Sequence, residues 1–102
     1  MDRRLQLQEI LEGLIENDNV YYQPPESLKM SYPCIRYSLS RHIDRYADNR
    51  KYINRKCYEV IVIDRNPESQ IPDKILEALP YSNLDRFYSA DNLNHFAMTI
   101  YY

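Results

Sequence analysis

The sequence has one glycine, two cysteines, two histidines and no tryptophan among its 102 residues. A phosphate-binding loop needs several glycines at close spacing, so a nucleotide site of that kind is excluded. No apolar run approaches the ~18 residues of a membrane span, and none forms the core of a signal peptide. One glycine and six prolines also disfavour a linker or a low-complexity tail. We therefore expect one domain over residues 1–102.

Tyrosine is present in excess, with eleven copies beside two phenylalanines. Its ring is apolar and its hydroxyl is polar, which suits β-strands and also surfaces that a partner buries while their edges stay wet. Neighbouring residues in a strand point to opposite faces. One ring of each doublet, Tyr21-Tyr22 and Tyr101-Tyr102, is therefore expected to point away from a one-sided core.

Hydrophobic periodicity predicts two helices and four or five strands. An amphipathic pattern indicates a helix over residues 3–16, and a second helix follows Ser69 as its N-cap, with Pro72 in its first turn. Residues 90–94 are rich in turn formers, so the last two strands should form an antiparallel hairpin. Apolar alternation or continuity predicts strands over residues 34–40, 58–64, 84–89 and 95–101, with a short edge strand over residues 20–23.

The predicted element order is α-β-β-α-β-β, with the short edge strand as an additional strand after the first helix. This order predicts an α+β fold. We expect a two-layer α/β sandwich, in which two helices cover one face of a mainly antiparallel sheet of four to five strands. The strand over residues 58–64 is apolar on both faces and should be central. Ile61, Ile63, Ala97 and Tyr101 should lie on the face without helices, exposed unless a second subunit covers them, which favours an oligomer.

Patterns for catalysis or metal binding are weak. His42 and His95 have no serine or cysteine at a recognisable spacing, and Asp64-Arg65 fits a turn or a surface ion pair. A metal site of Cys34, Cys57, His42 and His95 is conceivable, but no CxxC or HxxxH pair anchors it, and two buried thiols are the simpler interpretation. The prediction is a protein that is not an enzyme and that needs no metal or cofactor.

Residues 41–56 concentrate the positive charge. They hold six basic residues and two aspartates, a charge of +4, so the rest of a chain whose total is −2 carries −6. Three interpretations stay open: a nucleic-acid grip, a solvated hairpin tip, or one side of a charged contact between copies of the chain. The candidate contact residues, with two tyrosines as aromatic anchors, are Arg41, Arg45, Tyr46, Arg50, Lys51, Tyr52, Arg55 and Lys56.

Residues 32–102 resemble a known family. The likeness is carried by the strand YxVxVIDRxP that begins at Tyr58, the helix S-x-IPDKIL that begins at Ser69, and the ending DRFYxADNLNHF…YY. These features are similar to those of tail-completion proteins, also called tail terminators or head–tail joining proteins, of long-tailed phages of Gram-positive bacteria. The likeness covers about two-thirds of the chain, and none of its motifs is catalytic.

The resemblance implies a structural protein of a phage or prophage. Such proteins are small α/β domains that form a ring, commonly of six subunits, at the head-proximal end of the tail tube, where the ring ends tube polymerisation and joins tail to head. The implied partners are further copies of the chain, the tail tube protein, the head–tail connector and, without sequence preference, DNA in the lumen; no membrane is expected. The implied location is the virion, after synthesis in the host cytoplasm. The alternative is a small nucleic-acid-binding α/β module that uses the basic hairpin 41–56.

Overall fold

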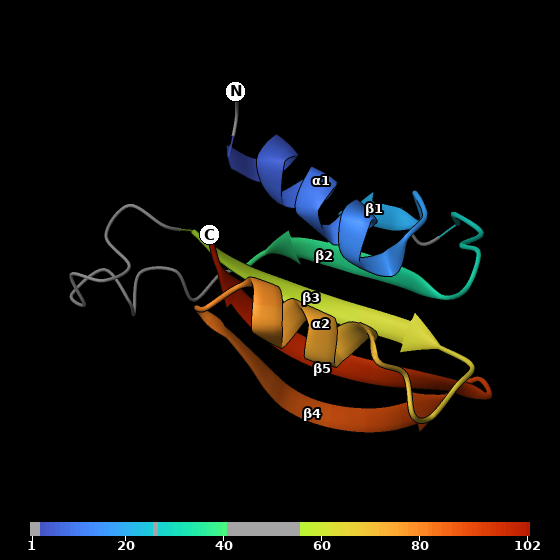
Figure 1. The fold of residues 1–102 in the computed structure, drawn as a ribbon. Coiled ribbons are helices and arrows are strands. Elements are labelled where there is room, and N and C mark those ends of the chain that lie inside the picture. Colours follow the sequence, from blue (N-terminus) through green and yellow to red (C-terminus); the bar gives the residue numbers. More distant parts are fainter. Residues whose placement is uncertain (1–2, 26, 41–55) are drawn as a thin grey trace.

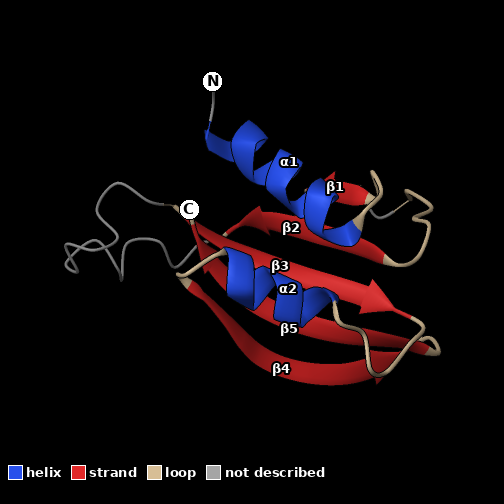
Figure 2. Cartoon of the chain, viewed as in Figure 1, coloured by secondary structure: helices blue, strands red, loops and turns tan. Residues whose placement is uncertain are grey.

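The computed structural model describes residues 3–25, 27–40 and 56–102. Five strands form one sheet in the order β1-β2-β3-β5-β4, and both helices lie over the same face of it (Figures 1 and 2). This confirms the predicted α+β class. The elements in chain order are α1 (Arg3–Ile15), β1 (Val20–Tyr22), β2 (Cys34–Leu39), β3 (Cys57–Asp64), α2 (Ile71–Ala78), β4 (Ser82–Ala90) and β5 (Leu93–Tyr101).

The sheet is mainly antiparallel, as predicted, but it is mixed because one edge strand is parallel to its neighbour. β2, β3, β5 and β4 pair antiparallel, whereas β1 runs parallel to β2, with Val20 beside Ile35. Parallel neighbours need a connection that returns the chain to the starting end of the strand, and residues 23–33 provide it. The edge strand expected over residues 20–23 is present as β1, directly after the first helix.

Helix α1 buries one face against the sheet. Leu7 and Leu11, one turn apart, are fully buried, and Glu16 ends the helix in the left-handed conformation with φ 63°. The polar side chain of Gln8 on this helix is directed towards the sheet. Its Nε2 donates to the Val20 carbonyl at 2.9 Å and its Oε1 accepts from the Tyr37 hydroxyl at 2.6 Å, so it satisfies polar groups at the edge of the sheet.

Helix α2 packs through Ile71, Ile75 and the following Leu79, and Pro72 lies in its first turn as predicted. The N-cap is Gln70, one residue beyond the predicted Ser69. The Ser69 hydroxyl still accepts the Ile71 N–H at 3.3 Å, so serine does serve the free backbone donors of the first turn.

Strands β4 and β5 form the predicted antiparallel hairpin, and both are longer than predicted. The turn consists of Asp91 and Asn92, with φ 55° and 61°. Two positive φ angles define a type I′ turn, whose twist matches that of the flanking strands, and Asp and Asn tolerate this conformation. A β-bulge interrupts β4 at Asp85, whose carboxylate accepts the Thr99 hydroxyl.

The sheet face without helices is more covered than predicted. Ile63 and Tyr101 are only 3% and 7% exposed within the single chain, so the expectation that they need a second subunit was wrong. Ile63 pairs in register with Cys34 on one side and His95 on the other, and the Tyr88 ring stacks on His95 at 4.8 Å. Of the four residues, Ile61 and Ala97 are partly exposed. The apolar surface left open on this face is therefore small.

Replacing Leu11 by alanine should test the packing of α1. Its side chain is fully buried in the core, so Leu11→Ala is expected to lower the free energy of unfolding by about 2–5 kcal/mol. The control is Leu5→Ala on the same helix, where the side chain is 45% exposed and the expected change is within about 0.5 kcal/mol. Urea denaturation followed by circular dichroism measures both. Equal losses for the two variants would contradict the placement of α1.

Candidate functional site

One of the eight predicted contact residues, Lys56, lies within the described part of the chain. It is exposed, directly precedes β3, and its carbonyl accepts the Tyr102 N–H at 2.9 Å. The Ser40 N–H donates to the Cys57 carbonyl at 2.8 Å, so the two flanks of the basic segment are held side by side at one end of the sheet. Arg41, Arg45, Tyr46, Arg50, Lys51, Tyr52 and Arg55 lie outside the described residues.

Helix α1 begins at this same end of the sheet (Figure 1). It adds two cations there, Arg3 and Arg4. The Arg3 guanidinium lies 4.6 Å from the centre of the Tyr102 ring, and its Nε donates to the Tyr102 carbonyl at 3.2 Å. The Arg4 guanidinium lies 4.4 Å from the centre of the Tyr22 ring. Charge over an aromatic face is attractive, so both cations are held in place. We call Arg3, Arg4 and Lys56 the basic end.

Arg3 and Arg4 were not among the predicted contact residues, although their position in the sequence carries a signal. Both lie in the first turn of a helix that has no acidic residue there. Cations are disfavoured at the positive end of the helix dipole, so two adjacent arginines at that position indicate compensating partners elsewhere. The partners are aromatic rings and a carbonyl from strands distant in sequence, which a helical pattern alone does not identify.

Three tyrosine rings pack against one another next to the basic end. The Tyr37 ring lies 4.9 Å from Tyr22 and 5.9 Å from Tyr58, centre to centre. The Tyr37 hydroxyl accepts from Arg4 at 3.3 Å, and burial raises the pKa of this hydroxyl while the Arg4 hydrogen bond opposes the rise. The Tyr22 ring is therefore in contact with the Tyr37 ring and with the Arg4 guanidinium, so less of its surface is available to stack on a nucleic-acid base.

The opposite end of the sheet carries carboxylates. There Asp64 Oδ1 accepts the Asn66 N–H at 3.0 Å, and Asn66 Oδ1 accepts the Glu68 N–H at 2.9 Å. These two side-chain turns confirm the predicted turn at Asp64-Arg65. The surface ion pair Lys74–Glu16, at 3.6 Å, lies near this end. We call the following residues the acidic end: Glu16, Asp18, Asp64, Glu68 and Asp91.

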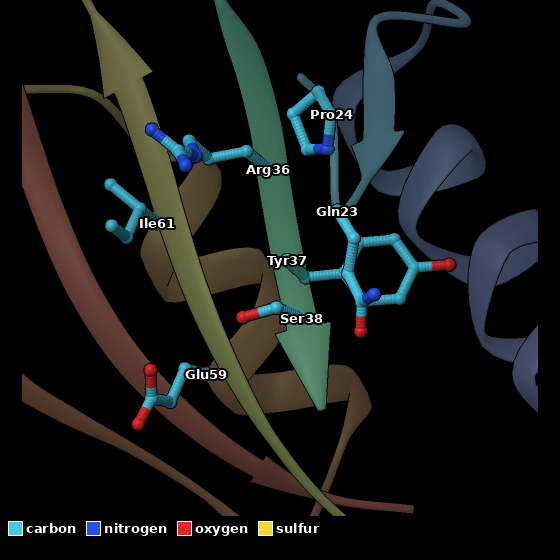
Figure 3. Close-up of a pocket in the computed structure, with 7 residues that line it drawn as sticks. All are labelled: Gln23, Pro24, Arg36, Tyr37, Ser38, Glu59 and Ile61. Atoms are coloured by element: carbon cyan, nitrogen blue, oxygen red, sulfur yellow. The ribbon is translucent and has the colours of Figure 1, made fainter. Parts of the chain in front are cut away.

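The open face of the sheet holds a second cationic position. Arg36 is exposed on β2, and no side chain in the described ranges forms an ion pair with it. A pocket of about 140 Å³ borders it, in which Arg36 and Ile61 lie on neighbouring strands (Figure 3). A second pocket, of about 170 Å³, has apolar walls that include Leu28 and Met30. The surface can accept a small polar or apolar side chain, and its residues show no pairing of a nucleophile with a base.

The two cysteines cannot share a metal ion. Cys34 pairs with Ile63 and Cys57 pairs with Tyr101, at opposite ends of β3, roughly 20 Å apart at the rise per residue of a strand. Both are free thiols. Within residues 3–25, 27–40 and 56–102, no group of three or more His, Cys, Asp or Glu side chains is placed to hold a metal, and neither helix is long and apolar enough to cross a bilayer.

Comparison with protein-family models, with curated proteins and with solved structures found no match. The function of this chain is therefore inferred from its own residues and geometry. One feature of the described surface is an excess of cations at one end of the sheet and an excess of carboxylates at the other, where Arg65 and Lys74 offset part of the negative charge.

The buried thiols give a pH-dependent prediction. Burial raises the pKa of the Cys34 thiol from 9.0 to about 11, against a smaller opposite effect of Arg36, and burial also raises the pKa of Cys57. At pH 8 about a thousandth of Cys34 should be thiolate, against about a tenth for an ordinary thiol of pKa 9. Ellman's reagent should therefore modify the folded protein at least tenfold more slowly than the urea-unfolded chain.

The same shift predicts how alkali affects stability. A pKa that is higher in the folded state favours the protonated form there. The contribution of Cys34 to the free energy of unfolding is therefore complete below pH 9 and is lost as the pH rises through about 11. Thermal unfolding of the wild type and of Cys34→Ala between pH 8 and pH 11 measures this loss. In the test with Ellman's reagent, rapid modification of both thiols at pH 8 in the folded protein would contradict the burial of Cys34 and Cys57.

Proposed function

We propose that this protein is a tail-completion protein, which assembles as a ring on the head-proximal end of a phage tail tube, ends tube polymerisation and prepares the tail for joining to the head. The observation that supports the proposal most strongly is the placement of the basic end and the acidic end at opposite ends of one sheet. A chain with this polarity presents unlike surfaces to its two neighbours.

Unlike surfaces are what a ring requires. Contacts between different patches of identical subunits are heterologous, and such contacts close into a ring when the rotation between neighbours permits it. The basic end of one copy, together with the basic segment attached there, meets the acidic end of the next. Exposed charges contribute little affinity, but they set the orientation and the rate of docking, and the half-buried Tyr22 and Tyr102 at the basic end supply contact area.

A terminator must also present different sides to the tube and to the head connector. The sheet has this asymmetry, because α1 and α2 cover one face (Figure 1). Alternation along the paired strands puts Arg36, Glu59 and Arg86 on the other face. A ring of such subunits therefore has two chemically distinct surfaces. This supports a junction between two different partners, with the tail tube protein on one side and the connector on the other.

Nucleic-acid binding through residues 41–56 is the second candidate, and one observation favours it. Arg3 and Arg4 lie at the end of the sheet where that segment attaches, so the cations available to phosphates exceed those of the segment itself. Against it, the chain is acidic overall, and guanidinium groups already lie over the Tyr22 and Tyr102 rings. A dedicated binder would show a steep loss of affinity with salt, whereas the ring protein should bind DNA weakly.

Reversing one charge at the basic end should impair head–tail joining. Lys56 is exposed and its described hydrogen bond uses its carbonyl, so Lys56→Glu should leave the fold intact while it weakens docking on the acidic end of the next copy. The matched control is Arg65→Glu, the same charge change at an exposed position beside the acidic end. Each variant is supplied in trans to a phage that lacks the gene. We expect several-fold fewer joined virions with Lys56→Glu and wild-type numbers with Arg65→Glu, as counted by electron microscopy. Equal numbers for both would remove Lys56 from the contact.

A further inference from the structure

The two edges of the sheet differ in how they are closed. At one edge β1 has three residues, and Pro24 and Pro25 follow shortly after it. The outward Val20 carbonyl of β1 already accepts the Gln8 amide from α1 at 2.9 Å. Short edge strands, prolines and a covering helix are the means by which proteins prevent sheets from pairing with one another. The β1 edge is therefore closed to a further strand.

The other edge, β4, is open. It has nine residues, and no strand pairs with its outer side in the part of the chain that the structure describes. Ala90 and Leu93 close the hairpin with β5, so by alternation the N–H and C=O groups of Phe87 and Ser89 point away from β5. Phe87 is 51% exposed and Leu84 is 45% exposed on the helix-facing side. Free backbone groups and apolar side chains thus lie together along one edge.

We propose that β4 pairs antiparallel with β4 of a second copy, with Phe87 opposite Phe87 of the partner subunit. The free N–H and C=O groups of each Phe87 then bond to one another, and the exposed part of each ring is covered by the other. The Phe87 ring already packs on Phe96 at 5.0 Å, so it is held in an orientation that presents its remaining surface outward.

The charges of β4 favour a second copy as the occupant. In this register Arg86 lies opposite Tyr88 of the partner subunit, and Asp85 lies opposite Ser89 of the partner subunit. Neither charged residue meets its own kind. Arg86 already lies 5.1 Å from the centre of the Tyr88 ring in its own chain, so the pairing offers the same attraction across the contact. The bulge at Asp85 limits the regular pairing to a few residues, which makes the contact weak and reversible.

This pairing goes beyond the proposed ring and does not depend on it. A two-fold contact uses the same patch on both copies and closes with two chains, so it cannot extend into a polar ring. It describes the free protein before assembly. If the β4 strands of two copies do not pair, the ring proposal is unaffected. If a phage without this gene forms normal virions, the pairing proposal is unaffected.

Disulfide cross-linking tests the register directly. Residues 86 and 88 form a non-hydrogen-bonded pair across the two-fold axis, where the Cα atoms of antiparallel strands are about 4.5 Å apart and a disulfide fits. Under mild oxidation, a mixture of Arg86→Cys and Tyr88→Cys chains should give a covalent dimer. Each variant alone should give several-fold less, and the wild type, whose two cysteines are buried, should give none.

Sedimentation equilibrium tests the contact without new cysteines. With rising concentration, the wild-type mass should increase from the 12.3 kDa of one chain towards twice that value. Phe87→Lys should remain at the mass of one chain, whereas the control Leu5→Lys, at a similarly exposed leucine on α1, should behave as the wild type. A wild-type mass of one chain at all concentrations, unchanged dimerisation of Phe87→Lys, or equal cross-linking in single and mixed samples would each overturn the proposal.

Discussion

Burial of β3 beneath both helices is the interaction on which the rest of the structure depends. Val60 and Val62 of β3 are fully buried, and their register partners on β2 and β5 include Ile35 and Met98, which are buried as well. Helix α1 packs towards β1 and β2 and helix α2 towards β4, so β3 is where the two halves of the core meet (Figure 1). The strongest apolar segment of the sequence thus pairs directly with β2 and β5, which in turn hold β1 and β4.

Fixing β3 also fixes the two ends of the surface. The strand begins beside Lys56 and ends at Asp64, so its eight residues separate the basic end from the acidic end by roughly 25 Å. At that distance, exposed charges of the same molecule are largely screened from each other at physiological salt. They remain available to neighbours. The same separation keeps Cys34 and Cys57 apart, so the two thiols form neither a disulfide nor a shared metal site, and each is buried among residues of the sheet.

The sequence predicted the helices and strands because their apolar residues repeat at the helical or strand period. It did not predict the direction of β1, because alternation of apolar residues is the same in parallel and antiparallel strands. The inward orientation of Gln8 and the partners of Arg3 and Arg4 were missed for a related reason. Their contacts join residues distant in the chain, and no local pattern records them. Ile63 was expected to be exposed because its cover, Cys34 and the stacked pair Tyr88 and His95, comes from strands on both sides.

The candidate site was predictable only in part. The charge of residues 41–56 is evident in the sequence, and the structure places one of its predicted contact residues, Lys56, beside Tyr102. The contribution of α1 to the same end depends on the fold, because it follows from the C-terminal strand reaching the start of the helix. The excess of cations at one end and of carboxylates at the other likewise becomes visible once the strand directions are known.

Deletion of the gene from its phage or prophage is the most direct test of the proposed role. Negative-stain electron microscopy of the lysate measures the length of the tails and the fraction joined to heads. If the protein ends the tail tube, the lysate should contain overlong or unjoined tails beside normal filled heads, and the wild-type gene supplied in trans should restore joined virions of ordinary tail length. Normal virions with tails of the usual length in the deletion lysate would contradict the role in tail completion.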